Sequence, residues 1–130
     1  MWVLWYERNG KRLSEEWWVS NLVAESVLDM LRRVGPEMAA SAQQKRWVSR
    51  LQDSTRGIWY CNGFNIADEF ESADEMEFWS GVAFELARRI CRNAPEGFDI
   101  DAQVMWVWAS FDLQRFLSIA AHELRKEQKE

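Results

Sequence analysis

Residues 72–92, SADEMEFWSGVAFELARRICR, carry the clearest helix signal in the chain. The stretch opens with a capping box, because Ser72 is followed three residues later by Glu75. Apolar residues then recur at helical spacing and would form one buried face, made of Met76, Trp79, Ala83, Leu86 and Ile90. Pro95 and Gly97 follow, and both residue types end helices. The stretch therefore predicts an amphipathic helix that runs from Ser72 to Cys91 or Arg92.

A second long helix is predicted downstream, from about Ile100 to Gln128. Asp99 can cap it, and an apolar stripe would face the core, made of Met105, Ala109, Leu113, Phe116, Ala120 and Leu124. Residues 104–111, VMWVWASF, are apolar almost throughout, so periodicity alone does not separate a buried helix from a buried strand there. The length of the segment and the helical pattern after it favour a helix.

The first half of the chain predicts two more helices and a minor β element. Residues 2–7 are aromatic and β-branched, and the Asn9-Gly10 turn would return them as a hairpin through Lys11 to Leu13. Ser14 would cap a helix that ends at Gly35-Pro36. A helix over residues 36–53 would have a thin apolar face of Ala40, Trp47, Val48 and Leu51. A turn at 54–57, a short strand at 58–61 and an Asn62-Gly63 turn would follow.

Length and composition indicate one globular domain that spans residues 1–130. Apolar residues make up 48% of the chain and charged residues 28%, which is a balance typical of folded proteins. The predicted fold class is mainly α, a single-domain bundle of about four helices with a short N-terminal β-hairpin or minor β element. Nine Trp residues are present, and we expect most of them in the core and one or two as exposed interface anchors.

The charge of the chain argues against nucleic acid and membranes as partners. The formal net charge is −5 and the pI is near 5.0, so anionic surfaces would repel it. Residues 66–130 hold fourteen Asp and Glu against seven Lys and Arg, so the acidity lies in this half. Cys61 and Cys91 are expected to be free thiols. No signal peptide and no membrane-spanning run is recognised, which predicts a cytoplasmic protein.

Residues 65–79, NIADEFESADEMEFW, contain six carboxylates and no Lys or Arg. A calcium loop would need a central Gly and alternating oxygen ligands, whereas here Phe70 interrupts the acids. Glu71 and Glu75 could form a hydrolytic acid and base, but nothing distinguishes them from their neighbours. His122 is the single histidine, and it stands without a second His at the spacing of a zinc site. We therefore expect no enzyme activity, no catalytic residue, no cofactor and no metal.

A helix start explains some of these acids, because carboxylates in the first turn interact favourably with the helix dipole. Asp74 and Glu75 fit this reading. The helix dipole does not account for Asp68, Glu69 and Glu77. Like charges that crowd together repel one another, so such a cluster favours a positively charged partner. Aromatic rings between the acids suit a protein interface. The predicted partner-binding residues, which would contact a basic protein, are Asp68, Glu69, Phe70, Glu71, Asp74, Glu77 and Trp79, with Phe70 or Trp79 as exposed anchor.

A short acidic chain with such a carboxylate and aromatic cluster resembles the immunity proteins of bacterial nuclease toxins, including those of bacteriocins and of contact-dependent growth inhibition. The resemblance is one of general character and implies a partner that is the basic nuclease domain of a toxin. Two alternatives remain open. One is a phage-encoded inhibitor or nucleic-acid mimic, and the other is a small helical hydrolase or ligand-binding domain with carboxylates in a Trp-lined pocket.

Overall fold

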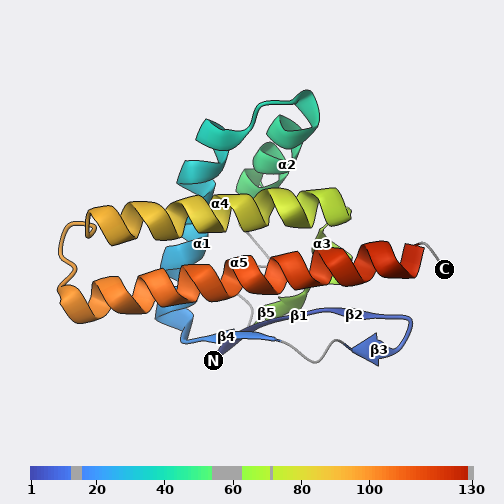
Figure 1. Ribbon diagram of the computed structural model, residues 1–130, viewed down its shortest axis with the longest axis horizontal. Helices are drawn as coiled ribbons and strands as arrows, with labels where there is room; N and C mark the ends of the chain where they lie inside the picture. Colours follow the sequence, from blue (N-terminus) through green and yellow to red (C-terminus); the bar gives the residue numbers. More distant parts are fainter. Residues whose placement is uncertain (13–15, 54–62, 71, 129–130) are drawn as a thin grey trace.

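The structure is a computed structural model that describes residues 1–12, 16–53, 63–70 and 72–128. It is mainly helical. Helices α4 (Ala73–Arg92) and α5 (Ile100–Gln128) lie side by side and antiparallel, and α1 (Asn21–Met38) crosses behind them (Figure 1). Helix α2 (Ala42–Asp53) packs against α1 and α4, and short strands lie on the other side of α5. The predicted helical bundle with a minor β element is confirmed.

The two long helices begin and end where the sequence predicts. The Ser72 hydroxyl oxygen accepts a hydrogen bond from the Glu75 backbone N–H at 3.2 Å, and the Asp99 carboxylate accepts one from the Ala102 N–H at 2.8 Å. The Ser80 hydroxyl of α4 donates to the Gln114 carbonyl oxygen of α5 at 2.9 Å, which fixes the register of the pair. All five residues of the predicted inner face of α4 are buried.

Residues 104–111 are helical, as predicted, but the inner stripe of α5 differs at one position. Met105 is 52% exposed, and Trp106 occupies the core instead, packed edge-on against Phe98 with ring centroids 4.9 Å apart. The remaining residues of the predicted stripe are buried. In an unbroken apolar run the sequence does not show which ring faces inward, and here the core selects the larger Trp side chain.

The prediction that a helix begins at Ser14 is wrong for residues 17–19, which form strand β4 (Trp17–Val19). Along this strand Trp17 is buried and Trp18 exposed, as side chains alternate in a strand. The Trp17 indole N–H donates to the Ala109 carbonyl oxygen of α5 at 3.1 Å. Helix α1 then begins at Asn21, with the Ser20 hydroxyl accepting from the Val23 N–H at 3.3 Å. Ser14 itself lies outside the described residues.

The predicted end of this helix at Gly35-Pro36 is also wrong, because α1 continues through both residues to Met38. A Cβ atom at Gly35 would lie only 3.0 Å from Cζ3 of Trp79. Gly35 therefore allows α1 to approach α4 closely and does not end the helix. Pro36 has no backbone N–H and so removes one hydrogen bond from α1, which ends two residues later at Met38.

The strands form two small sheets. In the first, β1 (Trp2–Trp5) lies between β4, which is antiparallel to it, and β5 (Gly63–Asn65), which is parallel to it. The second is the predicted hairpin, in which β2 (Glu7–Arg8) and β3 (Lys11–Arg12) pair across the Asn9-Gly10 turn. The hairpin is confirmed in this shorter form, while residues 2–5 pair elsewhere in the chain.

Gly63 belongs to strand β5, whereas the sequence predicted a turn there. Its φ is +125°, and a Cβ atom would lie 1.7 Å from the carbonyl oxygen of Val3, so the pairing with β1 requires glycine. The short helix α3 (Ile66–Glu69) follows and was not predicted. The predicted turn at 54–57 and strand at 58–61 lie outside the described residues.

Helix α2 begins six residues later than predicted, at Ala42, because α1 extends to Met38. The Ser41 hydroxyl oxygen accepts from the Gln44 N–H at 3.1 Å and caps α2. Trp47 and Val48, on the thin apolar face of α2, are buried. Ala40 was predicted on the same face, but it is exposed and lies before the helix begins.

Candidate protein-binding site

The first part of the acidic stretch lies on α3, which is fastened to the hairpin. The Asn65 side chain accepts hydrogen bonds from the backbone N–H groups of Ala67 at 3.2 Å and Glu7 at 2.8 Å. It also donates to the Glu7 carbonyl oxygen at 2.7 Å. Asp68 is exposed on this helix, and Glu69 is half-buried. Asn65 therefore anchors the start of α3, the helix that carries Asp68, to the hairpin.

The second part lies on α4 and has a positive partner that is distant in sequence. Arg125 of α5 donates to the Asp74 carboxylate at 2.5 Å and to both carboxylate oxygens of Glu77. These hydrogen bonds, to Glu77 first and then to Asp74, raise the pKa of the Arg125 guanidinium. The side chains of Asp74 and Glu77 nevertheless remain 73% and 56% exposed. One guanidinium thus holds two carboxylates in place and leaves a net negative charge at the surface.

Glu75 has a structural role, in contrast to its acidic neighbours. Its side chain is only 1% exposed and accepts from Arg50 of α2 and from the Trp79 indole N–H at 3.4 Å. A buried carboxylate needs such charged and polar partners, since an unpaired buried charge is very costly. Glu75 therefore ties α2 to α4 and is not available to a partner.

Trp79 is 2% exposed, which corrects its predicted role as an exposed anchor. Its ring packs edge-on against Phe78, with centroids 5.1 Å apart, and lies beside Gly35. The helical spacing that places Trp79 on the inner face of α4 also removes it from the surface. The prediction failed because Trp79 was assigned both to the core and to an interface.

Phe70 and Glu69 are half-buried at the end of α3. Phe70 packs against the core, and its backbone N–H donates to the Ile66 carbonyl oxygen at 2.9 Å. Burial raises the pKa of the Glu69 carboxyl above its usual value; the charge of Arg50 lowers it and that of Asp68 raises it further. Asp68 is therefore the fully exposed acid of α3, whereas Glu69 and Phe70 are only partly accessible.

A cavity of about 390 Å³ opens beside these residues, between the hairpin, α3 and the end of α5. Two acids, Glu7 and Asp68, and two aromatic rings, Tyr6 and Phe70, line its wall together with Arg8 and Gln128. Tyr6 lies with its hydroxyl 3.5 Å from the Glu127 carboxylate, and burial is the main cause that raises the pKa of the Tyr6 phenol.

Four of the seven predicted residues have exposed or half-buried carboxylates, on α3 and at the start of α4, and we call them together the acidic surface: Asp68, Glu69, Asp74 and Glu77. Phe70 lines the cavity beside it, Trp79 is buried, and Glu71 lies outside the described residues. The prediction that Glu77 has no internal counter-charge is wrong, because Arg125 supplies one from the C-terminal part of α5. No local sequence pattern shows a contact between residues 48 positions apart.

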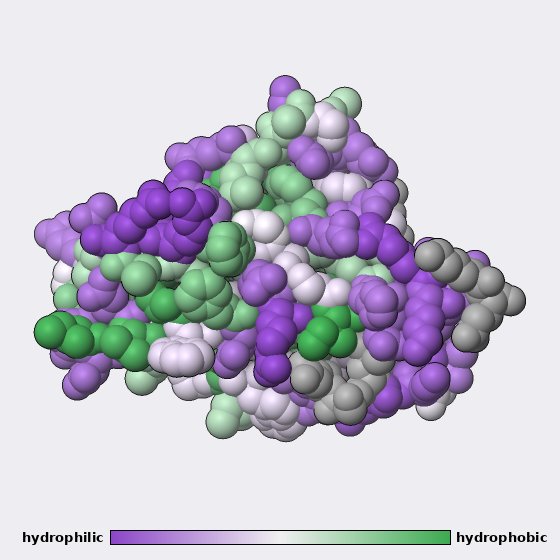
Figure 2. All heavy atoms as spheres, in the orientation of Figure 1, coloured by the Kyte–Doolittle hydropathy of each residue, from purple (hydrophilic) through white to green (hydrophobic). Residues whose placement is uncertain are grey.

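A second surface feature was missed by the sequence analysis. Five large apolar side chains on α4 and α5 are exposed by 45–76%, and we call them the apolar face: Phe84, Ile100, Val104, Met105 and Trp108. In Figure 2 the hydrophobic colours gather over this end of the two helices. The run VMWVWASF was the available signal, because a helix that is apolar all round has apolar residues on its outward side as well.

Trp18 and Trp108 are the strongly exposed tryptophans among the described residues, at 57% and 64%. His122 is also exposed, on the outward side of α5. Within the described residues, no three His, Cys, Asp or Glu side chains come together as a metal site. No helix in the described part of the chain is long and apolar enough to cross a membrane.

Comparison of the chain with models of protein families, with curated proteins and with solved structures finds no match. The function is therefore inferred from the surface itself.

Proposed function

We propose that this chain is a non-catalytic, cytoplasmic binding protein that captures a basic protein through the acidic surface. The observation that supports this best is the cavity with Asp68 and Glu7 in its wall, together with the exposed carboxylates Asp74 and Glu77 on α4. A partner's Lys or Arg would place its alkyl stem along Phe70 and its charged head at Asp68. Carboxylates around the recess would steer such a partner toward it.

Arg125 makes the acidic surface a better binding surface than a free cluster of acids. Arg125 on α5 holds Asp74 and Glu77 on the neighbouring α4, which reduces the side-chain entropy that binding would otherwise cost. The two carboxylates share one positive charge, so a cationic partner still meets net negative charge. The surface is thus arranged before the partner arrives, which favours tight and rapid binding.

The character of the partner follows from the same chemistry. A basic cleft that holds phosphates is complementary to rigid carboxylates, so the nuclease domain of a toxin is the partner that we propose. The protein would then act as an immunity protein that blocks its cognate toxin. A phage-encoded inhibitor would use the same surface against another basic protein, and the identity of the co-purified partner distinguishes the two.

The test compares two double charge reversals in chains purified from the native host. Asp68→Lys with Glu77→Lys changes the acidic surface, and Glu25→Lys with Glu96→Lys changes exposed acids elsewhere by the same total charge. We expect the wild type and the control variant to retain a stoichiometric basic protein that salt releases. The first variant should associate with it about 10- to 1,000-fold more slowly.

Equal behaviour of the two variants would contradict the proposal, as would binding that does not depend on salt. The isolated partner is then assayed for cleavage of nucleic acid with and without one equivalent of the wild-type chain. Loss of cleavage on addition of the chain supports the immunity function. A partner that cleaves equally well in its presence argues against it.

A further inference from the structure

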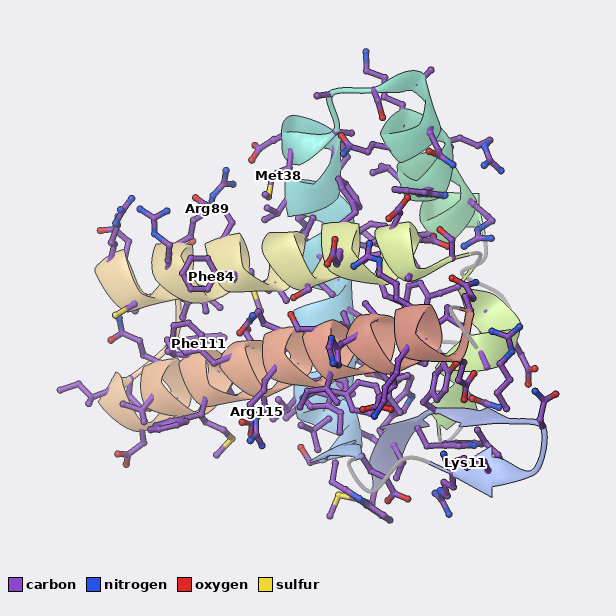
Figure 3. The ribbon with its side chains drawn as sticks, turned by 45° about the vertical axis from the view of Figure 1, so that its right-hand side comes forward. Lys11, Met38, Phe84, Arg89, Phe111 and Arg115 are labelled. Carbon is purple, nitrogen blue, oxygen red and sulfur yellow. The ribbon has the colours of Figure 1, made fainter. Side chains whose placement is uncertain are left out.

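The exposure of the apolar face indicates a second protein-binding surface, separate from the acidic surface. Ile100, Val104 and Trp108 follow one another at intervals of four residues on the outward side of α5 and are 76%, 48% and 64% exposed. Phe84 of α4 extends the face, since its ring lies 5.9 Å from that of Phe111 (Figure 3). Contiguous exposed apolar surface of this kind marks an interaction site, and Trp is enriched at the centre of interfaces.

Two exposed charged residues of α5, Asp101 and Arg115, are placed so that they would pair with each other between two antiparallel copies. Asp101, Trp108 and Arg115 are spaced by seven residues, so they form one stripe along α5, and both charged side chains are exposed. Asp101 stands as far before Trp108 as Arg115 stands after it. When two copies of α5 pack antiparallel about Trp108, Asp101 of each copy meets Arg115 of the other.

Of the apolar residues, Trp108 lies at the centre of this arrangement, where it meets Trp108 of the other copy. A parallel arrangement would instead place Asp101 against Asp101, and like charges would repel. A two-fold interface uses the same patch on both copies, which this distribution of charge satisfies.

We propose that the chain forms a two-fold symmetric dimer through the outward side of α5 between Asp101 and Arg115, with Trp108 at the centre. The interface is independent of the acidic surface. Trp108 and Arg125 are separated along α5 by about 25 Å, at roughly 1.5 Å per residue. The dimer would therefore present two acidic surfaces at its outer ends and bind two basic partners, or one bivalent partner with added avidity.

The test is the molecular mass in solution, by sedimentation equilibrium at concentrations up to about 0.1 mM, which reports dissociation constants in the micromolar range. We expect twice the 15.4 kDa of one chain. Trp108→Glu should yield monomers, while Trp18→Glu, which changes an equally exposed Trp outside the interface, should leave the dimer intact. Circular dichroism checks that both variants remain folded.

Charge exchange tests the antiparallel arrangement specifically. Asp101→Arg and Arg115→Asp should each raise the dissociation constant about 10- to 100-fold, because each creates two contacts between like charges. The double variant restores both contacts with reversed polarity and should bind nearly as the wild type does. A monomeric wild type, a dimer that tolerates Trp108→Glu, or a double variant no better than the single ones would overturn the proposal. Asp68→Lys should leave the dimer unchanged, which separates this test from that of the proposed function.

Discussion

The ion pair between Arg50 and Glu75 gives the sharpest test of the structure. Replacement of Arg50 by Met removes the guanidinium and keeps most of the apolar stem. Glu75 then loses a charged partner while its side chain stays 1% exposed. Breaking a fully buried pair costs 3–5 kcal/mol, and an exposed pair is worth about 0.2–1 kcal/mol. The Arg50 side chain is 41% exposed, so water screens it in part, and we expect a loss of about 2 kcal/mol.

Urea denaturation measures this loss. With a slope of roughly 1–3 kcal/mol per molar, the midpoint should fall by about 1 M for Arg50→Met. Lys45→Met is the matched control, because Lys45 is exposed on the same helix; it should change the free energy of unfolding by less than about 0.5 kcal/mol.

A double variant separates the pair from a general loss of packing. Arg50→Met together with Glu75→Gln leaves no buried charge, and the Gln oxygen can still accept from the Trp79 indole N–H. The double variant should therefore be about 1 kcal/mol more stable than Arg50→Met alone. The reasoning fails if Arg50→Met costs no more than Lys45→Met, or if the effects of the two substitutions simply add.

Three glycines give further predictions. Gly35→Ala should destabilise the protein by about 1–2 kcal/mol, because the added Cβ presses on the Trp79 ring, whereas Gly81→Ala has open space and should stabilise α4 by about 0.5–1 kcal/mol. Thermal unfolding of the two variants checks the difference in sign, and a gain at Gly35 would show that Trp79 can move. Gly63→Ala should cost more than about 3 kcal/mol, because its Cβ would collide with the Val3 carbonyl oxygen. A near-native melting temperature would refute the pairing of β5 with β1.

The long helices could be predicted from the sequence because their signals are local. Ser72 and Asp99 cap their own helices, and all five residues that the apolar spacing assigns to the inner face of α4 are buried. Caps and periodicity depend on neighbours within a few residues, so one sequence is sufficient to read them.

The sheet and the course of α1 could not be predicted in this way. Trp17–Val19 becomes a strand because it pairs with β1 and inserts Trp17 against α5, and neither contact is local. The Gly35-Pro36 pair normally indicates the end of a helix, yet Gly35 is required here for close contact with Trp79. Tertiary packing overrode the local preference in both cases.

For the acidic surface, the sequence located the charges but not their counter-charges. Asp68 and Asp74 are exposed as expected, whereas Arg50 and Arg125 reach Glu75 and Glu77 from helices far along the chain. A run of acids without local basic residues is therefore not evidence that all of them await an external partner. Arg50 and Arg125 neutralise part of the acidic run from within the protein. The proposed function rests on the negative charge that is left exposed after this pairing.

The topology of the first sheet also bears on how the chain folds. The parallel pair of β1 and β5 joins residues 3–5 to residues 63–65, and closing so long a loop is entropically costly. Helices α4 and α5 are joined by a connection of only seven residues, 93–99, and bury each other's apolar faces. Local contacts form faster than distant ones. We therefore expect the α4–α5 hairpin to form first and the docking of β5 onto β1 to be a late step in folding.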